Sequence, residues 1–273
     1  MNTFSTEENS DTSIKVLQLS DLHLFSSPEE TLLGVNTEQS FLSVLSLAKT
    51  SSWPPDIIIL TGDLSQDTSK ESYDRLLSHL VPLSIPCFVL PGNHDTPRSL
   101  LETFQHPLVS YQPFLHHENW IFAFLDSEKP NEEGGVLKEY EIKNLAEEIK
   151  KHPLKQVLIC LHHQLKHVGS AWIDTMAIEN PDSLQALISS TPQIRGLIHG
   201  HTHQEFASQL FGTAIFGTPS TCFQFKPHCK EFTVDTLAPG YRWLRLSPSG
   251  DIETAVIRLS EAPKNLEHGS AGY

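Results

Sequence analysis

The segment at residues 57–67, with the sequence IIILTGDLSQD, constrains the fold of this chain more than any other. Its apolar and mostly β-branched start predicts a short, fully buried strand. Gly62 then lets the backbone turn tightly, so that Asp63 emerges at the carboxyl end of the strand, where open α/β sheets form their sites. A carboxylate there can bridge two metal ions or cap the following helix, and this segment alone favours the cap, because GD after a strand is common.

The first predicted strand has the same kind of ending. Residues 14–20, IKVLQLS, alternate as a strand does and lead into Asp21 and His23. The two-residue period of a strand would place both side chains on one side, within reach of one metal ion. A lone DxH motif is weak, since by itself it more often reflects a strand-end cap next to an incidental histidine.

A third strand, predicted at 85–90, runs into PGNHD and so places Asn93 and His94 at its end. Helices predicted at 38–50 and 69–80 separate the three strands. This β-α-β-α-β order implies parallel strands, because each crossover returns the chain to the same end of the sheet. The polar side chains that follow the strands should therefore gather at one edge.

Two later strands end in histidines. The strand predicted at 156–161 is followed by an HH pair that begins at His162, and the one at 195–198 by HGHTH, which contains His201 and His203. Gly200 permits a turn there, so that these last two imidazoles can point to two metal ions from one loop.

The remaining pattern predicts an α/β first half and a β-rich second half, which is an α/β fold with mixed α+β character. We expect a single domain at 14–260, preceded by a disordered lead-in at 1–13 and followed by a tail at 261–273. A loop is expected at 25–36. The other expected elements are a strand at 119–125, helices at 138–151 and 182–189, and strands at 206–210, 213–216, 241–246 and 252–259, the last two forming a hairpin.

The candidate ligands form a mixed set of imidazole, carboxylate and amide groups. Such a set fits iron, manganese, cobalt or zinc better than magnesium or calcium. Each motif is weak by itself, but their joint occurrence, each after a strand, favours a metal centre. The candidates are Asp21, His23, Asp63, Asn93, His162, His201 and His203, with His94 beside Asn93.

Charge and composition limit the partners of the chain. A net charge of −14 argues against nucleic acid or an anionic membrane as a partner, but not against a small phosphate ester beside metal cations. No apolar run is long enough to span a membrane. The four cysteines lack CxxC spacing, so we expect reduced, packing-related thiols in a cytoplasmic protein.

The other histidines have no place in these motifs. We interpret His106, His116, His117 and His199 as surface or structural residues.

Taken in order, the motifs DLH, GD, GNHD, HH and GHTH resemble the pattern of the calcineurin-like metallophosphoesterases. The chain is similar in particular to the bacterial class III 3′,5′-cyclic-AMP phosphodiesterases, through the segments TLLGVNTEQS, GSAWID, TPSTCFQFKPHC and TLAPGYR. The resemblance extends from about residue 14 to residue 259. GDLSQDTSK lacks the arginine that the Ser/Thr protein phosphatases carry after the GD motif, which counts against that branch.

The resemblance implies a four-layer αββα sandwich with a dinuclear centre of divalent or trivalent transition-metal ions, with iron, manganese or both expected. By motif position, the first ion would be held by Asp21, His23, Asp63 and His203. The second would be held by Asp63, Asn93, His162 and His201, so that Asp63 bridges the two. The prolines usual after the metal-binding histidine of the HH motif are replaced here by Gln164 and Leu165, and position in the pattern favours His162 over His163.

The implied reaction is hydrolysis of 3′,5′-cyclic AMP to 5′-AMP, with a hydroxide held by the two ions as nucleophile. His94 would face the leaving group as the catalytic acid. The residues expected to contact the substrate are His23, Asp63, Asn93, His94 and His203. The sequence does not decide whether Asp95 or Asp67 orients His94. Nor does it decide whether Phe223, Phe225 or Trp172 stacks on the base or packs in the core.

Two other functions remain open at this point. The chain could act on another phosphodiester or on a phosphomonoester, or it could be a catalytically silent, non-enzymatic scaffold that keeps the fold and uses it for binding. Retention of all seven ligand positions and of His94 argues against a scaffold, which needs none of them. The sequence is silent on oligomeric state and on selectivity between cyclic AMP and cyclic GMP.

Overall fold

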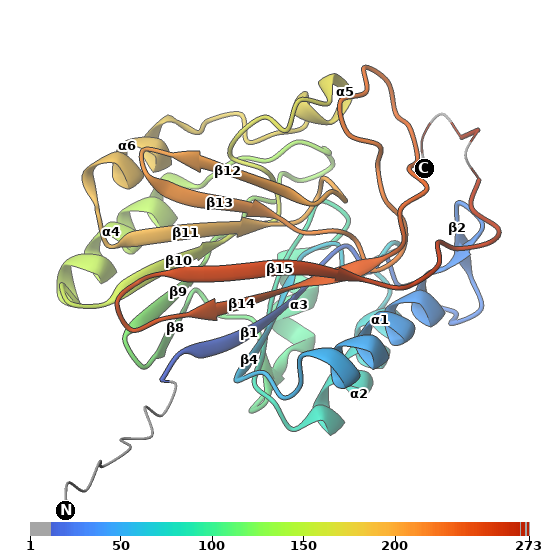
Figure 1. Ribbon diagram of the computed structural model, residues 1–273, viewed down its shortest axis with the longest axis horizontal. Coiled ribbons are helices and arrows are strands. Elements are labelled where there is room, and N and C mark those ends of the chain that lie inside the picture. The colour runs from blue at the N-terminus through green and yellow to red at the C-terminus, as the bar shows by residue number, and fades with distance from the viewer. Residues whose placement is uncertain (1–11, 268, 271, 273) are drawn as a thin grey trace, which may run out of the picture.

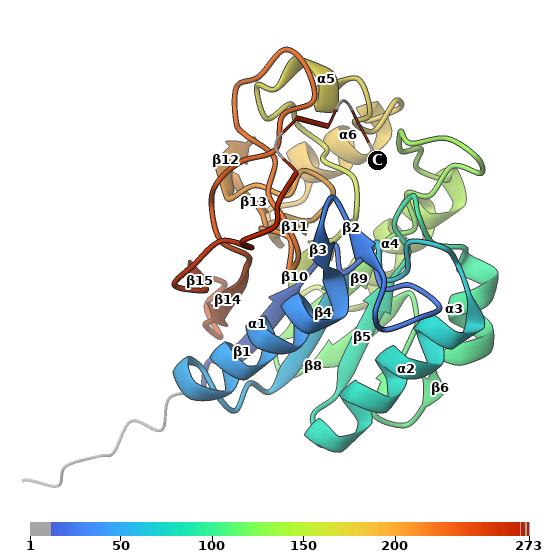
Figure 2. The same ribbon diagram turned by 90° about the vertical axis from the view of Figure 1, so that its right-hand side faces the viewer.

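Two mixed β-sheets pack face to face and carry helices on their outer faces in the computed structural model (Figures 1 and 2). The structure describes residues 12–267, 269–270 and 272. The first sheet has the strand order β15 (Ile252–Arg258), β14 (Gly240–Leu246), β1 (Ile14–Leu19), β4 (Ile57–Thr61), β5 (Cys87–Leu90), β7 (Val109–Ser110) and β6 (Gln105–His106). The second has the order β12 (Phe206–Leu210), β13 (Thr213–Gly217), β11 (Ile194–His199), β10 (Gln156–Cys160), β9 (Trp120–Phe124) and β8 (Phe114–His117).

Three apolar clusters hold these layers together. One joins α1 (Thr37–Ser51), α2 (Lys70–Leu80) and α3 (Pro97–Thr103) to the outer face of the first sheet. A second joins α4 (Glu139–Lys151) and α6 (Asp182–Ser190) to the outer face of the second sheet, and a third lies between the sheets. These clusters confirm the expected αββα sandwich. They also explain why the central strands are apolar on both faces.

The strands that carry the polar motifs run parallel, as the sequence predicts. β1 pairs with β4 and β4 with β5 in the first sheet, while β9, β10 and β11 are parallel in the second. Their carboxyl ends therefore lie at one end of the sandwich. The predicted hairpin is also present, formed by β14 and β15.

Several local predictions need correction. The expected loop at 25–36 contains a short hairpin of β2 (Thr31–Leu32) and β3 (Val35–Asn36). The segment at 98–117, in which no clear pattern is visible, forms α3, β6, β7 and β8. Short elements such as these lack the length over which a hydrophobic period can be recognised. The remaining helical elements are η1 (Val81–Leu83) and α5 (Ala171–Asp174).

The C-terminal tail returns to the body of the protein. Leu266 is buried in a cluster with Leu33 and Val35, and the amide of Glu267 donates to the carbonyl of Leu33. The part of the predicted lead-in at residues 1–11 lies outside the described residues. All four cysteines are free, and three of them are buried, whereas Cys229 is partly exposed. Among the described residues, no helix combines the length and apolarity needed to cross a membrane.

Candidate metal centre

All the predicted ligands come together at the carboxyl ends of five strands, β1, β4 and β5 from one sheet and β10 and β11 from the other. The carboxylates and imidazoles are buried, with exposed fractions of 0–5%. Asn93 and His94 are only half-buried and line a cavity of about 200 Å³ beside the cluster. The two sheets thus supply an inner group of potential ligands and an outer pair that faces solvent-accessible space.

The ligands reach the centre through left-handed backbone turns. The φ angles are +54° at Asp21, +50° at His23, +49° at Asp63, +62° at His201 and +46° at His203. This corrects the expectation that strand alternation aligns Asp21 with His23, because β1 already ends at Leu19. Non-glycine residues seldom adopt this conformation, and its concentration at one site is typical of functional geometry.

Two glycines allow the ligand loops to approach one another. At Gly62, which has φ of +88°, an added Cβ would lie 2.4 Å from Nδ1 of His162. At Gly200 it would lie 2.0 Å from Oγ of Ser20 and 2.8 Å from Oδ2 of Asp21. A side chain at either position would therefore displace a candidate ligand.

Hydrogen bonds orient three of the imidazoles in the same way. The Nδ1 of His23 lies 2.6 Å from Oε1 of Gln66, that of His162 lies 2.8 Å from the carbonyl of Thr61, and that of His203 lies 2.9 Å from the carbonyl of Phe223. Because each partner is an acceptor, each Nδ1 carries the proton and donates it. At His23 and His203, Nε2 then keeps its lone pair directed into the centre, which is the arrangement that second-shell acceptors give to metal-binding histidines. At His162, burial lowers the pKa but the carboxylate of Asp63 beside Nε2 raises it to about 9 overall, so that a metal ion would replace a proton on this nitrogen.

The Nε2 atoms of His23 and His203 lie 3.3 Å apart. With both protons on Nδ1, two lone pairs face each other and no hydrogen bond can form between them. A cation between the two nitrogens would resolve this repulsion. Consistent with a neutral ring at His23, burial lowers the pKa of this imidazole to about 3.

Asp63 lies at the middle of the cluster. Its Oδ2 is 3.3 Å from Nε2 of His162 and 3.7 Å from Nε2 of His23, while its Oδ1 accepts the backbone amide of His94. Burial raises the pKa of Asp63, but the nearby imidazoles of His162 and His94 together hold it well below its usual value. Asp63 is therefore an anion placed between two groups of nitrogen donors.

Two buried atoms of the cluster lack a hydrogen-bond partner among the described residues, Oδ2 of Asp21 and Nε2 of His201. The other oxygen of Asp21 accepts the amide of His201 and lies 3.4 Å from Nε2 of His203. An unpaired buried carboxylate oxygen is costly unless it binds a proton or a cation. These atoms, with the facing lone pairs, fit transition-metal ions.

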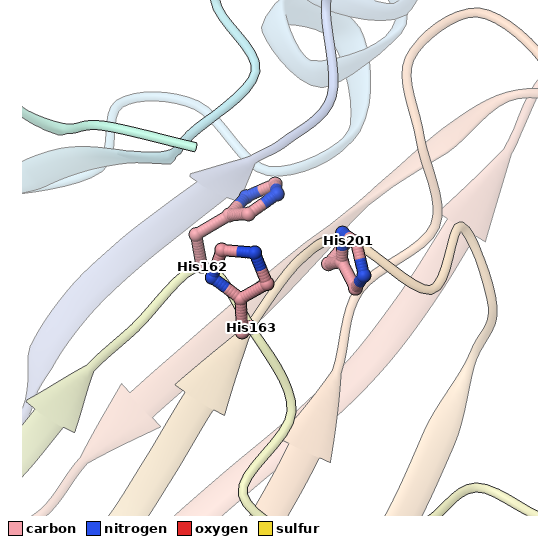
Figure 3. A group of neighbouring side chains, drawn as sticks. All are labelled: His162, His163 and His201. Atoms are coloured by element: carbon pink, nitrogen blue, oxygen red, sulfur yellow. The ribbon is translucent and has the colours of Figure 1, made fainter. Parts of the chain in front are cut away.

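The structure separates the roles of His162 and His163, which lie beside His201 (Figure 3). His163 uses both ring nitrogens within the protein, since Nδ1 lies 2.8 Å from Oγ of Ser127 and Nε2 lies 3.1 Å from the carbonyl of Glu133. His162 instead directs Nε2 toward Asp63. The geometry therefore favours His162 as the ligand, as position in the motif does.

Both carboxylates considered as partners of His94 are engaged by other donors. Asp67 accepts the backbone amides of Ser26 and Ser69, at 2.7 and 3.0 Å. Asp95 is 2% exposed. Its donors are the amides of Leu64, Ser65 and Gly92 and the hydroxyl of Tyr73, at 2.9–3.1 Å. Asp95 therefore ties the turn after β4 to the turn after β5.

We expect Asp95→Asn to lower the free energy of unfolding by about 3 kcal/mol, because its amide group cannot accept from all of these buried donors. Chemical denaturation would measure the loss. Asp56→Asn, a substitution of an exposed aspartate before β4, is the control and should change stability little. Equal stability of the two variants would contradict the role given to Asp95.

Gln66 is a residue that the sequence analysis missed, because no motif marks it. Its side chain holds the Nδ1 of His23. We expect Gln66→Ala to weaken metal retention by roughly 10- to 100-fold, since loss of a second-shell acceptor frees the ligand ring. Metal content after dialysis against graded chelator concentrations would measure this. Gln66→Glu keeps an acceptor and should retain metal; if it behaves like Gln66→Ala, the orienting role is wrong.

The cavity beside the centre was not predicted as a unit. Its walls come from loops distant in sequence, and of its apolar wall the sequence points only to Trp172 and Phe225. Phe223 is 0% exposed and packs in the core, whereas Phe225, which is 2% exposed and stacks on His203 with ring centroids 4.2 Å apart, also lines the cavity. The cavity is lined by Asn93, His94, Glu133, Trp172, Ile173, Met176, His201, Phe225, Phe232 and Gly272.

An αββα sandwich with clustered imidazoles and carboxylates at its strand ends defines a phosphoesterase of the dinuclear-metal class. The chain belongs to the calcineurin-like phosphoesterase family, whose family model matches residues 14–205. Among solved structures, a dimetal phosphatase from Danio rerio has a TM-score of 0.59 at 15% identity, covering 90% of this chain and 99% of that one. GAP50 of Plasmodium has a TM-score of 0.64 at 12% identity, covering 92% and 86%. These two similarities concern the fold alone.

Curated proteins are similar over nearly the whole chain. The chain is 37% identical over 260 residues to the 3′,5′-cyclic adenosine monophosphate phosphodiesterase CpdA of Haemophilus influenzae, covering 94% of this chain and 95% of that protein. It is 35% identical to the CpdA of Escherichia coli, covering 95% of each. It is also 35% identical to the CpdA of Pseudomonas aeruginosa, covering 100% of each.

Proposed function

We propose that this chain hydrolyses 3′,5′-cyclic AMP to 5′-AMP at a centre of two transition-metal ions. The observation that carries the proposal is the pair of facing Nε2 lone pairs of His23 and His203, next to the Asp63 carboxylate and 5.0 Å, between ring centroids of His23 and His94, from a residue that lines the cavity. Identities of 35–37% to the CpdA proteins, over nearly their full lengths, support cyclic AMP as the substrate.

The proposed ligands divide into two sets. Asp21, His23, Asp63 and His203 would hold one ion. Asp63, Asn93, His162 and His201 would hold the other, and Oδ1 of Asn93 lies 3.0 Å from Nε2 of His162. Iron, manganese or both fit this mixed nitrogen and oxygen set. Two such ions, held by these residues, would lower the pKa of a bound water molecule and neutralise phosphate charge.

The chain itself supplies a proton donor and an oriented binding surface. His94 lines the cavity and its backbone is fixed by the hydrogen bond to Asp63, which suits it to give a proton to the departing O3′ of the ribose. Substrate binding is assigned to His23, Asp63, Asn93, His94 and His203.

We assign the base to the apolar wall of the cavity, which Trp172 forms together with Phe225 and Phe232. The Nε1 atom of Trp172 is buried and lacks a hydrogen-bond partner among the described residues. A purine offers both a ring face and ring-nitrogen acceptors to this indole.

The Trp172→Ala variant should raise KM for cyclic AMP roughly tenfold, since one base–aromatic stack contributes about 1–3 kcal/mol. Its kcat should change little, because Trp172 is assigned to the base and not to the phosphate. The control substrate is bis(p-nitrophenyl) phosphate, which has no purine, and its KM should stay the same. A parallel loss on both substrates would instead indicate a collapsed cavity.

The test of the proposed function is turnover by protein stripped of metal and reloaded with manganese or iron. Cyclic AMP and bis(p-nitrophenyl) phosphate are compared, with 5′-AMP identified as the product. If only the model diester is cleaved, the metal centre is correct and another phosphoester is the substrate. If neither is cleaved and the purified protein carries no metal, the chain acts as a scaffold.

We further propose that residues 14–260 act as one catalytic domain in the cytoplasm. The thiols of Cys87, Cys160 and Cys222 are free and buried, which suits a reducing compartment.

A further inference from the structure

A second group of potential metal ligands lies outside the cavity, where α4 meets the edge strand β8. The sequence alone indicates a surface or structural role for His116, but its Nε2 is 2.9 Å from Oε1 of Glu148. The Nε2 of His152 is 3.2 Å from the same oxygen. The three side chains are partly shielded, with exposed fractions of 32%, 15% and 39% in the order His116, Glu148, His152.

Strand register places His116 on the face that α4 covers. His116 pairs with Ile121, whose side chain belongs to the cluster beneath α4, whereas the next residue, His117, pairs with Trp120 of the cluster between the sheets. Residues directly opposite each other in a sheet share a face. Glu148 and His152 are one helical turn apart, so all three side chains converge from fixed positions on two elements.

We propose that His116, Glu148 and His152 bind a zinc-like divalent transition-metal ion that ties the edge strand β8 to the end of α4. Zinc bound at about 2.0–2.1 Å in a tetrahedral site separates its ligand atoms by roughly 3.3 Å. The observed distances of 2.9 and 3.2 Å from Glu148 to the two imidazoles require shifts of only a few tenths of an ångström. Two imidazoles and one carboxylate suit zinc, and a water molecule can fill the fourth position.

The helix terminus also favours a cation at this place. His152 is the C-cap residue of α4, where the partial negative charge of the helix terminus is directed. Lys151 lies 3.2 Å from Oε2 of Glu148, which leaves Oε1 to face the two histidines.

This site is separate from the catalytic centre. His116 pairs with Ile121, and Ile121 pairs with Val157, which is five residues before His162. At about 3.3 Å per residue, the site therefore lies roughly 16 Å along the sheet from the catalytic centre.

Equilibrium dialysis against zinc, followed by elemental analysis, tests the proposal without reference to activity. Wild-type protein should bind one zinc ion per chain more than the double variant His116→Ala, His152→Ala, while any zinc in the catalytic centre is common to both. The matched control is His117→Ala, which removes a neighbouring imidazole from the opposite face and should keep the wild-type stoichiometry. Glu148→Gln, with nearly the same shape, should lose the ion as well.

Thermal unfolding gives a second readout. Zinc should raise the Tm of wild-type protein and of His117→Ala by several degrees more than that of the double variant, because an ion that binds only the folded state stabilises it. If wild-type protein and the double variant bound the same number of zinc ions per chain, the proposal would be overturned, and the three side chains would form only hydrogen bonds with one another. Loss of the ion in His117→Ala would overturn the assignment of ligands.

Discussion

The Asp63→Asn variant should lose turnover of cyclic AMP by on the order of 10³-fold and lose most of its bound metal. The Oδ2 atom of Asp63 lies between Nε2 of His162 and Nε2 of His23, at 3.3 and 3.7 Å. An amide removes the negative charge that both ions would share. Charge stabilisation by a bound ion is worth several kcal/mol, and each 1.4 kcal/mol changes a rate about tenfold.

The measurements for Asp63 are kcat/KM and metal content of the same purified sample. Asp56→Asn is the matched control, because Asp56 precedes the same strand at its opposite end, where it accepts the amide of Lys15. It should keep both activity and metal. If Asp63→Asn retained two ions per chain and near wild-type turnover, Asp63 would not bridge the centre.

The positions of the candidate ligands can be predicted from the sequence because they depend on the order and direction of the strands. A buried strand followed by a turn and a polar residue gives a position at the strand's carboxyl end, and parallel order brings several such ends together. Asp63 and Asn93 are found in this way from local sequence alone. The histidines after β10 and β11 follow from the same rule, although they belong to the other sheet.

The conformation of the ligands could not be predicted from their residue types. Strand alternation correctly predicts that Asp21 and His23 lie close together, but not why. Both residues lie beyond the end of β1 and have positive φ angles. Tertiary contacts maintain these turns, as when the amide of Asp21 donates to the carbonyl of Gly62 and the amide of His23 to that of Asp63. A single segment carries no signal for contacts of this kind.

Residues that act through a single contact with a residue distant in sequence also cannot be recognised from sequence patterns. Gln66 orients His23, and Ser127 holds His163, yet neither belongs to a recognisable period or motif. Trp172 lies in a four-residue helix, too short for a hydrophobic repeat. The same holds for β8, where the register that brings His116 beneath α4 emerges only from the pairing with β9.

The second large effect is expected at His94. His94→Ala should lower kcat for cyclic AMP by roughly 10²–10⁴-fold, the usual contribution of a general acid, while the metal content stays unchanged. The ring of His94 lines the cavity, 5.0 Å from the ring of His23, and its residue is half-buried whereas the carboxylate and histidine ligands are buried. Its removal therefore takes away a proton donor without removing a proposed ligand.

The leaving group separates proton donation from other roles of His94. A ribose alkoxide needs a proton as it departs, whereas p-nitrophenolate is stable without one. The defect of His94→Ala should therefore shrink to less than about tenfold on bis(p-nitrophenyl) phosphate. A defect of equal size on both substrates would mean that His94 stabilises charge on the phosphate instead, and a fall in metal content would mean that it supports the centre itself. Steady-state kinetics on both substrates, with elemental analysis of the same samples, decides among these roles, because only an acid makes the penalty depend on the leaving group.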